Sequence, residues 1–176
     1  MFSGGMDSSL LLIQAQWSGV VPVPLFVDYG QPHLEQELAA ARSQVGDHLR
    51  VVKTSLSGGI VGREESPVVP GRNAALLSIG VNLAVVESCG EVWFGACRAD
   101  AVLFPDCRQE FVDAYNAMLE AQGVGVVVKA PLVNNTKREI RDMLGRMLSR
   151  TWSCYFPIDG RQCGQCGACK ARVSED

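Results

Sequence analysis

Short apolar segments alternate with amphipathic ones along most of the chain, and this alternation restricts the possible folds more than any other feature. The apolar segments are rich in β-branched residues and have the length of buried strands. The segment 33–45 shows the other pattern, because its apolar residues recur at helical spacing. A chain that alternates strands and helices builds a parallel sheet with helices on its faces, and ligands bind at the carboxyl ends of the strands. We therefore predict an α/β fold with a doubly wound parallel sheet.

The boundaries of the predicted elements follow from composition and from cap residues. Asp7 and Ser8 are suitable N-cap residues for the first helix, and Thr136 with Glu139 predicts a capping box for the last. The helix at 73–88 is almost entirely apolar, so we expect it to be buried. Strands are predicted at 21–29, 49–53, 91–95 and 124–129, helices at 10–17, 33–45, 73–88, 109–122 and 136–148, and a loop at 54–71.

The 176 residues fit one ordinary domain with a small appendage. We predict that residues 1–150 form the α/β domain and that residues 151–176 form a metal-binding tail packed on the same domain. The strand expected before the first glycines is reduced to residues 1–2. Either the sheet has a short central strand, or the true N-terminus lies upstream.

Composition and charge make nucleic acids and membranes less expected as binding partners. The hydrophobic content is 47% and the net charge is −3, values that suit a protein with a substantial core. The chain has no basic stripe, which lowers the expectation of nucleic-acid binding. Its longest apolar stretches are too short to span a membrane. The opening MFSGG resembles no secretory leader, so we expect a cytoplasmic protein with reduced thiols.

A glycine-rich loop stands directly before the first predicted helix, in the sequence Ser3-Gly4-Gly5-Met6-Asp7-Ser8-Ser9. Two consecutive glycines allow backbone N–H groups to converge on an anion, and a helix N-terminus adds unsatisfied donors. Asp7 is a candidate ligand for Mg²⁺ on bound phosphates. Neither the Walker A pattern nor the dinucleotide fingerprint is present. The plain alternative is a glycine turn capped by Asp and Ser.

Four cysteines are concentrated in the tail, with the spacing C-x8-C-x2-C-x2-C. Four thiolates suit a tetrahedral zinc ion, and a site with no open position is structural rather than catalytic. An iron–sulfur cluster can use a similar spacing, and a disulfide is disfavoured in a reduced compartment. For Cys107, packing is a better expectation than a role as a nucleophile. The predicted metal ligands are Cys154, Cys163, Cys166 and Cys169.

Polar clusters follow the predicted strands, where an α/β enzyme keeps its site. They lie at 28–31 with His33, at 71–73, and at 95–108. Lys137, at the start of the last helix, is placed to neutralise phosphate charge. For each residue alone, a solvated loop or a helix cap is an equally plain explanation. Their joint placement favours a site.

The chain resembles the family of 7-cyano-7-deazaguanine synthases. The glycine loop matches the SGGxDS signature of PP-loop ATP pyrophosphatases. Further matching segments cover nearly the whole chain, and PDCRQEF, TWSCY and CGQCGACKAR are more specific than the loop. The segments are FSGGMDS, VDYGQPH, VPGRNAALLS, GACRADAVLFPDCRQEF, APLVNNTKREI, TWSCY and CGQCGACKAR.

The resemblance implies an adenine nucleotide alpha hydrolase-like fold, a homodimer and a ligase that uses ATP with Mg²⁺. It implies that 7-carboxy-7-deazaguanine is adenylated and aminated by ammonia, and that the amide is activated by a second ATP and becomes the nitrile. Catalytic roles are expected for Asp7, Lys137, Asp106 and Arg108. ATP is expected to contact Phe2, Ser3, Gly4, Gly5, Met6, Asp7, Ser8, Ser9, Leu10 and Asp28. The deazapurine is expected to contact Tyr29, Gln31, His33, Arg72, Asn73, Asp100 and Phe104. Structural zinc is expected on the four tail cysteines, one ion per chain.

Other functions remain open at this point. A divergent relative would stop at the amide or adenylate another carboxylate. PP-loop enzymes of tRNA thiolation or lysidine formation need a basic RNA-binding appendage, which this acidic chain lacks. A zinc-containing binding module on an inert nucleotide fold is the non-enzymatic alternative.

Overall fold

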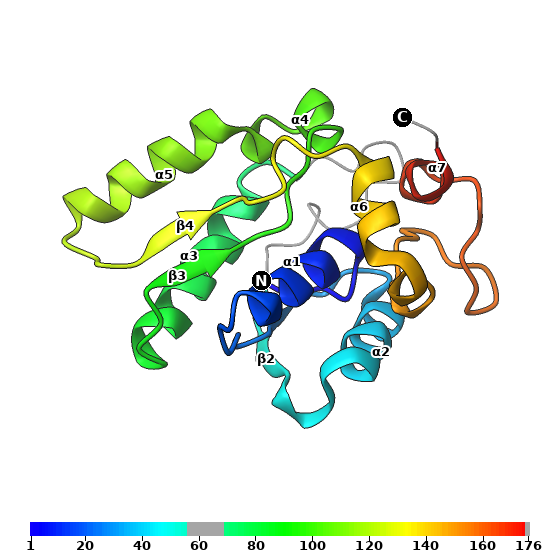
Figure 1. Cartoon of the computed structure of the whole chain (residues 1–176), viewed down its shortest axis with the longest axis horizontal. Coiled ribbons are helices and arrows are strands. Elements are labelled where there is room, and N and C mark those ends of the chain that lie inside the picture. Colours follow the sequence, from blue (N-terminus) through cyan, green and yellow to red (C-terminus); the bar gives the residue numbers. More distant parts are fainter. Residues whose placement is uncertain (56–68, 175–176) are drawn as a thin grey trace.

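The computed structural model of the chain describes residues 1–55 and 69–174 (Figure 1). The predicted loop at 54–71 lies largely outside the described residues. The helices are α1 (Met6–Trp17), α2 (Leu34–Val45), α3 (Arg72–Val86), α4 (Asp100–Leu103), α5 (Gln109–Ala121), α6 (Lys137–Leu144) and α7 (Gly167–Val173). The strands are β1 (Leu25–Asp28), β2 (Arg50–Lys53), β3 (Glu91–Trp93) and β4 (Val127–Lys129), and the 3₁₀ turns are η1 (Gly46–His48), η2 (Pro105–Cys107) and η3 (Gly145–Arg150).

The described strands form two parallel pairs. β1 pairs with β2, with Leu25 opposite Arg50, and β3 pairs with β4, with Trp93 opposite Lys129. Strand β1 is shorter than the predicted 21–29 because Pro22 and Pro24 lack the N–H group that a ladder requires. The predicted α/β class with parallel strands is confirmed.

Residues 1–2 lie between the two pairs. The Phe2 amide donates to the Leu25 carbonyl of β1 over 2.6 Å. The Met1 nitrogen donates to the Trp93 carbonyl of β3 over 2.7 Å. These two residues therefore connect the pairs in the place of a central strand. The glycine loop follows at once, at the carboxyl ends of β1 and β3.

Helix α1 begins earlier than predicted, at Met6 rather than Leu10. The prediction that Asp7 and Ser8 cap it was wrong, because Gly5 occupies the N-cap position without a side-chain cap. Both polar side chains have other partners: Asp7 binds Lys137, and Ser8 Oγ donates to the Gly5 carbonyl over 3.1 Å. The loop and the first turn of α1 are therefore one continuous structure.

The capping box of α6 is confirmed. Thr136 Oγ1 accepts from the Glu139 amide over 3.2 Å, and Glu139 Oε2 accepts from the Thr136 amide over 2.9 Å. The helix ends at Leu144 rather than at 148, because Gly145 takes φ +50° and the chain continues as η3. The capping box places Lys137 at the first helical position.

Helix α3 is buried on one face only, so the expectation of a wholly buried helix was wrong. Leu77 and Val81 pack into the core, whereas Val85 and Val86 are 58% and 73% exposed. Apolar residues all round a helix indicate burial only if another layer covers its outer side. In the described structure α3 contributes one face to the core around β3.

Three apolar clusters hold the helices against the two strand pairs or against one another. In Figure 1, α5 and the β3–β4 pair lie on the left, α2 lies below, and α6 and α7 lie on the right with α1 in the centre. One cluster joins α3 and α5 to β3 and β4 (Leu77, Val81, Val92, Val112, Tyr115, Leu119, Val128). A second joins α1 to α6 (Met6, Leu10, Leu11, Leu132, Ile140, Leu144), and a third joins α2 to β1 (Phe2, Phe26, Ala41). None of the helices in the described part of the chain has the length and apolarity to cross a bilayer.

Gly4 is predicted to tolerate no side chain. It has φ +75°, and a Cβ atom there would lie 2.6 Å from the Ala41 amide nitrogen and 3.0 Å from the Glu37 carbonyl oxygen. Both obstacles are backbone atoms of α2, so they cannot rotate away. We expect Gly4→Ala to lower the free energy of unfolding by about 2–4 kcal/mol, from left-handed strain plus overpacking. Urea unfolding measures the loss.

Gly19 provides the matched control, because it has φ +73° and a Cβ atom there would meet none of the described residues within 4 Å. Gly19→Ala therefore carries the backbone strain alone, about 1–2 kcal/mol. Equal losses in the two variants would contradict the close contact between the loop and α2.

Candidate active site and metal centre

One cavity of about 490 Å³ lies at the carboxyl ends of β1 and β3. It is bounded by the glycine loop, the residues after β1, the start of α3, the loop after β3 and the segment after η3. Most of the predicted site residues line it: Phe2, Ser3, Gly5, Met6, Asp7, Ser8, Tyr29, Gln31, His33, Arg72, Asn73, Asp100, Phe104 and Lys137.

Six predicted residues are not among the lining residues. Gly4 packs behind the loop on α2, and Ser9 and Leu10 are fully buried inside α1. Asp28 Oδ1 accepts from the Gly30 amide over 3.1 Å and so shapes the turn after β1. The other two are Asp106, which lies in η2, and Arg108, which follows it. Arg108 Nε donates to the Ala101 carbonyl over 2.9 Å.

The loop presents backbone donors to the cavity. The first helical hydrogen bond of α1 runs from the Ser9 amide to the Gly5 carbonyl over 3.0 Å. The amides of residues 6–8 therefore precede the helical ladder, as the first N–H groups of any helix do. Ser3 Oγ lies 3.3 Å from Ser8 Oγ and accepts from the Gly5 amide over 3.3 Å. Hydroxyls, free amides and the positive end of a helix dipole are groups with which proteins bind anions.

Lys137 joins two carboxylates at the edge of this loop. Its Nζ lies 2.8 Å from Asp7 Oδ2 and 3.2 Å from Asp100 Oδ2, and its side chain is only 9% exposed. Burial alone would lower the pKa of Lys137, but the two carboxylates outweigh it and raise that pKa well above its usual value. The ammonium is therefore permanently charged.

Asp7 has an unusual environment for a carboxylate. Burial raises its pKa, Asp100 raises it further, and Lys137 opposes both. Its Oδ2 binds Lys137, whereas the buried Oδ1 has no hydrogen-bond partner among the described residues. A buried oxygen of this kind is a suitable ligand for a hard cation.

Gly95 brings the end of β3 against the loop. A Cβ atom at this position would lie 2.8 Å from Asp7 Cβ and 3.1 Å from the Ser8 amide nitrogen. The missing side chain lets the two backbones approach closely, as is usual where glycine follows a strand. This approach fixes Asp7 beside the residues that follow β3.

The wall after β1 is a polar network. Gln31 is buried and accepts from the Tyr29 amide over 3.0 Å, and its Nε2 donates to Glu37 over 3.1 Å. His33 Nε2 lies 3.4 Å from the same carboxylate, and its ring centroid lies 5.5 Å from that of Tyr155. Burial raises the pKa of both Tyr29 and Tyr155. Both phenols are therefore neutral hydrogen-bonding groups at physiological pH.

The two thiols near the cavity are buried, and burial disfavours their thiolate form. Burial raises the pKa of Cys97 to about 11 and that of Cys107 to about 12. Cys107 accepts a weak hydrogen bond from Asn73 Nδ2 over 3.6 Å. A nucleophilic cysteine needs a lowered pKa, so these values favour packing over covalent chemistry.

The C-terminal segment supplies lining residues that the predicted site omitted. Trp152, Ser153, Tyr155 and Phe156 line the cavity, together with residues of α7. The first three belong to the TWSCY motif and Phe156 follows it directly; within the motif, only Cys154 had a predicted role, as a metal ligand. The spacing of the cysteines does not indicate that the residues on either side of Cys154 line the ligand cavity.

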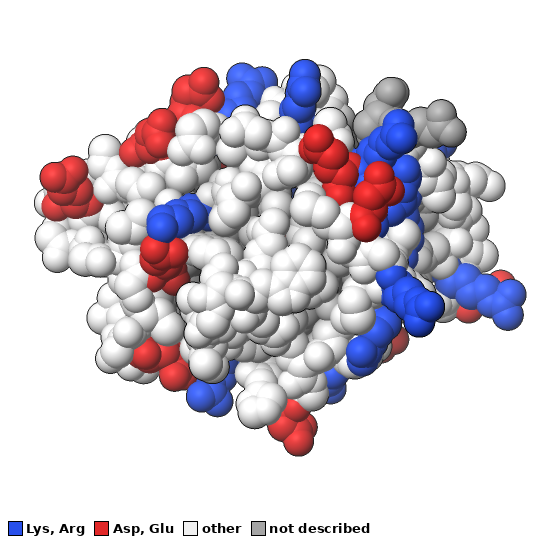
Figure 2. All heavy atoms as spheres, viewed as in Figure 1, with Lys and Arg blue, Asp and Glu red and all other residues white. Residues whose placement is uncertain are grey.

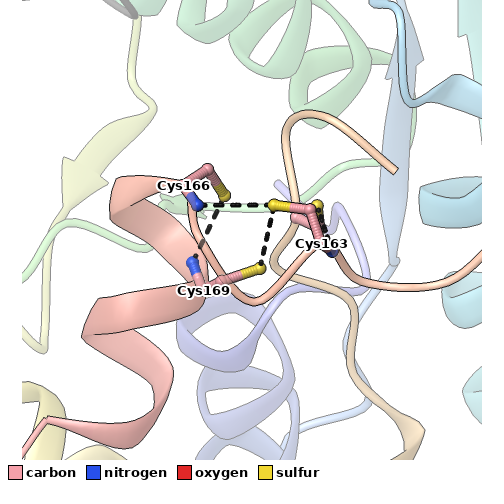
Figure 3. A group of neighbouring side chains, drawn as sticks. Cys163, Cys166 and Cys169 are labelled. Carbon is pink, nitrogen blue, oxygen red and sulfur yellow. Dashed lines mark hydrogen bonds between the residues drawn. The ribbon is translucent and has the colours of Figure 1, made fainter. Parts of the chain in front are cut away.

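The four tail cysteines form a closed cluster. The Sγ atoms of Cys154, Cys163, Cys166 and Cys169 all lie within 4.8 Å of one another, and none is in a disulfide. Figure 3 shows Cys166 and Cys169 at the start of α7, facing Cys163, whose sulfur lies 3.9 Å from that of Cys169. Four thiolates around tetrahedral zinc lie about 3.8 Å apart, given the usual zinc–sulfur length. The donor set and its spacing fit such an ion.

Backbone amides donate to three of the four cluster sulfurs, those of Cys154, Cys163 and Cys166. Cys163 Sγ accepts from the amides of Gln165 and Cys166 over 3.4 and 3.3 Å, and these bonds lower its pKa to about 6. Cys154 Sγ accepts from the Cys163 amide, and Cys166 Sγ from the Cys169 amide. Such N–H···S bonds stabilise thiolates, the form in which cysteine binds metals.

Charges are mixed on the face of the molecule shown in Figure 2. The centre of this face is uncharged, and basic side chains are most frequent on the right, over α6 and the C-terminal segment. Acidic side chains lie among them.

Comparisons with known proteins identify the family of the chain. Residues 53–175 match the model of the family described as "Queuosine biosynthesis protein QueC". The chain is 34% identical over 201 residues to the 7-cyano-7-deazaguanine synthase of Psychromonas ingrahamii. The aligned region covers 98% of the chain and 89% of that relative. Synthases of the same name from Citrifermentans bemidjiense and Alteromonas mediterranea are 35% and 36% identical over 98% of the chain, with 89% and 90% of the relatives covered.

Proposed function

Because this chain belongs to the QueC family of queuosine biosynthesis proteins, we propose that it is an ATP-dependent ligase that makes 7-cyano-7-deazaguanine from 7-carboxy-7-deazaguanine and ammonia. The observation that carries the proposal is the glycine loop at the start of α1, open to the cavity beside the buried Asp7–Lys137 pair. A helix N-terminus with free amides and a fixed ammonium is suited to triphosphate.

The chemistry requires two activations. A carboxylate oxygen of the substrate attacks the α-phosphorus of ATP, the bond to pyrophosphate breaks, and an acyl adenylate forms. Ammonia adds to the acyl carbon and loses a proton, and AMP leaves to give the amide. The amide oxygen then attacks a second ATP, again with release of pyrophosphate. Loss of AMP and of two protons from nitrogen gives the nitrile.

The chain's own residues neutralise charge and fix geometry. The loop amides and the Ser3 and Ser8 hydroxyls hold the pyrophosphate oxygens, and Lys137 stabilises the charge that grows on them. Asp7 Oδ1 is the proposed ligand for the Mg²⁺ that accompanies ATP. Positioning two reactants in one cavity removes much of the entropic barrier to their reaction.

The remaining site residues divide by location. We assign the deazapurine to the wall formed by Tyr29, Gln31, His33, Arg72, Asn73, Asp100 and Phe104. Asp106 and Arg108 act from outside the cavity lining, where Arg108 fixes the α4–η2 loop through Ala101. The four cysteines hold structural zinc, and residues 151–176 belong to the same domain as 1–150. The working form is a homodimer.

Product mass tests the function. Purified protein is incubated with 7-carboxy-7-deazaguanine, ammonia and Mg-ATP, and we expect the nitrile with two AMP per product. Accumulation of the amide with one AMP would refute nitrile formation and identify the chain as an amide-forming relative. If no carboxylate releases AMP, the chain is a zinc-containing binding module.

Asp7→Asn is expected to reduce pyrophosphate release by at least about a hundredfold, because the amide is a poor Mg²⁺ ligand. The fold should persist, because asparagine has the same shape and Lys137 keeps Asp100. Asp113→Asn is the matched control, since Asp113 lies on the exposed side of α5. Unchanged release in Asp7→Asn would remove this carboxylate from the mechanism.

A further inference from the structure

The segment from Thr151 to Cys154 lies against the glycine loop. The Trp152 amide donates to the Gly4 carbonyl over 3.0 Å. A Cβ atom on Gly5 would lie 3.5 Å from the Trp152 carbonyl oxygen, so the two backbones are in contact there. The loop is thus held between α2, which packs against Gly4, and a segment almost 150 residues further along the chain.

The hydrogen bond to Gly4 acts on the peptide unit that directly precedes the free amides of residues 6–8. A peptide unit is planar and trans, so the Gly4 carbonyl and the Gly5 amide point in opposite directions. Fixing the carbonyl on Trp152 therefore fixes the direction of the Gly5 N–H. Gly4 sits at φ +75° and glycine has few internal restraints, so the orientation of this peptide unit depends on its hydrogen bonds, namely this one and the bond from the Gly5 amide to Ser3 Oγ.

Arg172 holds the segment in place from α7. Its guanidinium donates to Thr151 Oγ1 over 2.6 Å and to Ser153 Oγ over 3.2 Å, one bond on each side of Trp152. It also donates to the Leu148 carbonyl. A planar fork of donors that meets three acceptors fixes the segment in a way that a lysine cannot reproduce.

The other end of the segment is fixed by the cysteine cluster. Cys154 is fully buried in the cluster, and its carbonyl accepts from Trp152 Nε1 over 2.8 Å. Helix α7, which carries Arg172, begins at the cluster, since Cys166 is its N-cap. Both supports of Trp152 therefore originate in the C-terminal segment.

We propose that Arg172 is a positioning residue for the phosphate-binding loop, acting through Thr151–Ser153 and the Trp152–Gly4 hydrogen bond. The C-terminal segment then sets the direction of the loop amides, and not only the stability of the chain. The anion at the loop rests on the function proposed above, whereas the mechanical link rests on the hydrogen bonds alone.

Hydrogen exchange and anion binding test this role in Arg172→Ala. Well below the melting temperature, we expect peptides covering residues 2–10 to exchange about tenfold faster, as for the loss of one net hydrogen bond and its neighbours. The affinity for Mg-pyrophosphate, measured by calorimetry without turnover, should fall about tenfold. The bound zinc should remain at the wild-type amount, which separates the effect from loss of the cluster.

Arg141→Ala is the matched control. Arg141 lies on α6 and donates to the carbonyls of Arg172 and Ser174, so it holds the same helix through hydrogen bonds that do not involve residues 151–153. It should lower the melting temperature while leaving loop exchange and pyrophosphate affinity within about twofold of wild type. Arg172→Lys should recover only part of the loss, because it lacks the fork.

Equal loop exchange and equal affinity in Arg172→Ala and Arg141→Ala would overturn the proposal and leave Arg172 a stabilising residue. If Arg172→Ala does not fold, the double variant Thr151→Val, Ser153→Ala removes the acceptors and is judged by the same two measurements. If wild type forms no product, but Arg172→Ala still exchanges faster than wild type at residues 2–10, only the proposed function is refuted. If wild type forms product, but loop exchange is the same in Arg172→Ala and in wild type, only the positioning role is refuted.

Discussion

Replacing Lys137 with methionine is expected to reduce AMP and pyrophosphate release by about a thousandfold or more, and to lower the free energy of unfolding by about 3–5 kcal/mol. The activity loss follows from removing a fixed positive charge beside the phosphate loop. The stability loss follows because Asp7 and Asp100, only 20% and 25% exposed at their side chains, would face each other without a counter-charge. Stopped assays of AMP and urea unfolding measure the two effects.

The stability loss in Lys137→Met should depend on pH. The pKa of Asp7 is already raised by burial and by Asp100, and without the ammonium it rises further. A group whose folded pKa is raised stabilises the fold increasingly as pH falls through that pKa. The penalty should therefore be larger at pH 8 than at pH 5. A pH-independent penalty would contradict the repulsion between the carboxylates.

Lys129→Met controls for the loss of any lysine. Lys129 pairs with Glu91, and the two side chains are 48% and 42% exposed. An exposed ion pair contributes at most about 1 kcal/mol, so this variant should keep its activity and nearly all its stability. Losses of similar size in the two variants would refute the special role of the buried lysine.

Replacing Cys166 with serine is expected to abolish zinc binding, which wild type should show at about one ion per chain. Serine is a poor ligand for a soft site, and three thiolates leave the tetrahedron open. We expect a loss of at least about 3 kcal/mol of stability, a fraction of the roughly 10–16 kcal/mol with which structural zinc binds. Metal analysis and thermal unfolding with and without a chelator measure both.

Cys89→Ser is the matched control for Cys166→Ser. Cys89 is half-buried in the turn after α3, outside the cluster, with its Sγ 3.8 Å from the Glu87 carbonyl. It should keep its zinc and its response to chelator. A chelator that lowers the melting temperature of Cys166→Ser as much as that of wild type would place the metal elsewhere.

The fold followed from the sequence where the signals were local. Apolar runs marked β2 and β3, and Thr136 with Glu139 marked the start of α6 through a capping box that the structure contains. The start of α1 did not follow, because Asp7 and Ser8 have the chemistry of caps but are engaged elsewhere. A cap preference cannot reveal that a lysine 130 residues away competes for the same side chain.

The site was predictable in its parts rather than in its connections. Parallel strands bring their carboxyl ends to one edge, so the clusters near Asp7, His33 and Asp100 were expected to meet, and all three line the cavity. The contribution of Trp152 was not predictable, because it depends on how the tail folds back. That path is set by Arg172 and the cysteine cluster, which are long-range contacts with no local signal.

The raised pKa of the cavity thiol bears on the design of covalent ligands. Cys107 is a cysteine that lines the cavity, so an electrophilic analogue of the substrate would naturally be aimed at it. With a pKa of about 12, only about one thiol in 10⁵ is ionised at pH 7. Warheads that need a thiolate will therefore react slowly there, and Lys137 is permanently protonated. Reversible compounds that mimic the acyl adenylate are the better starting point for inhibitors.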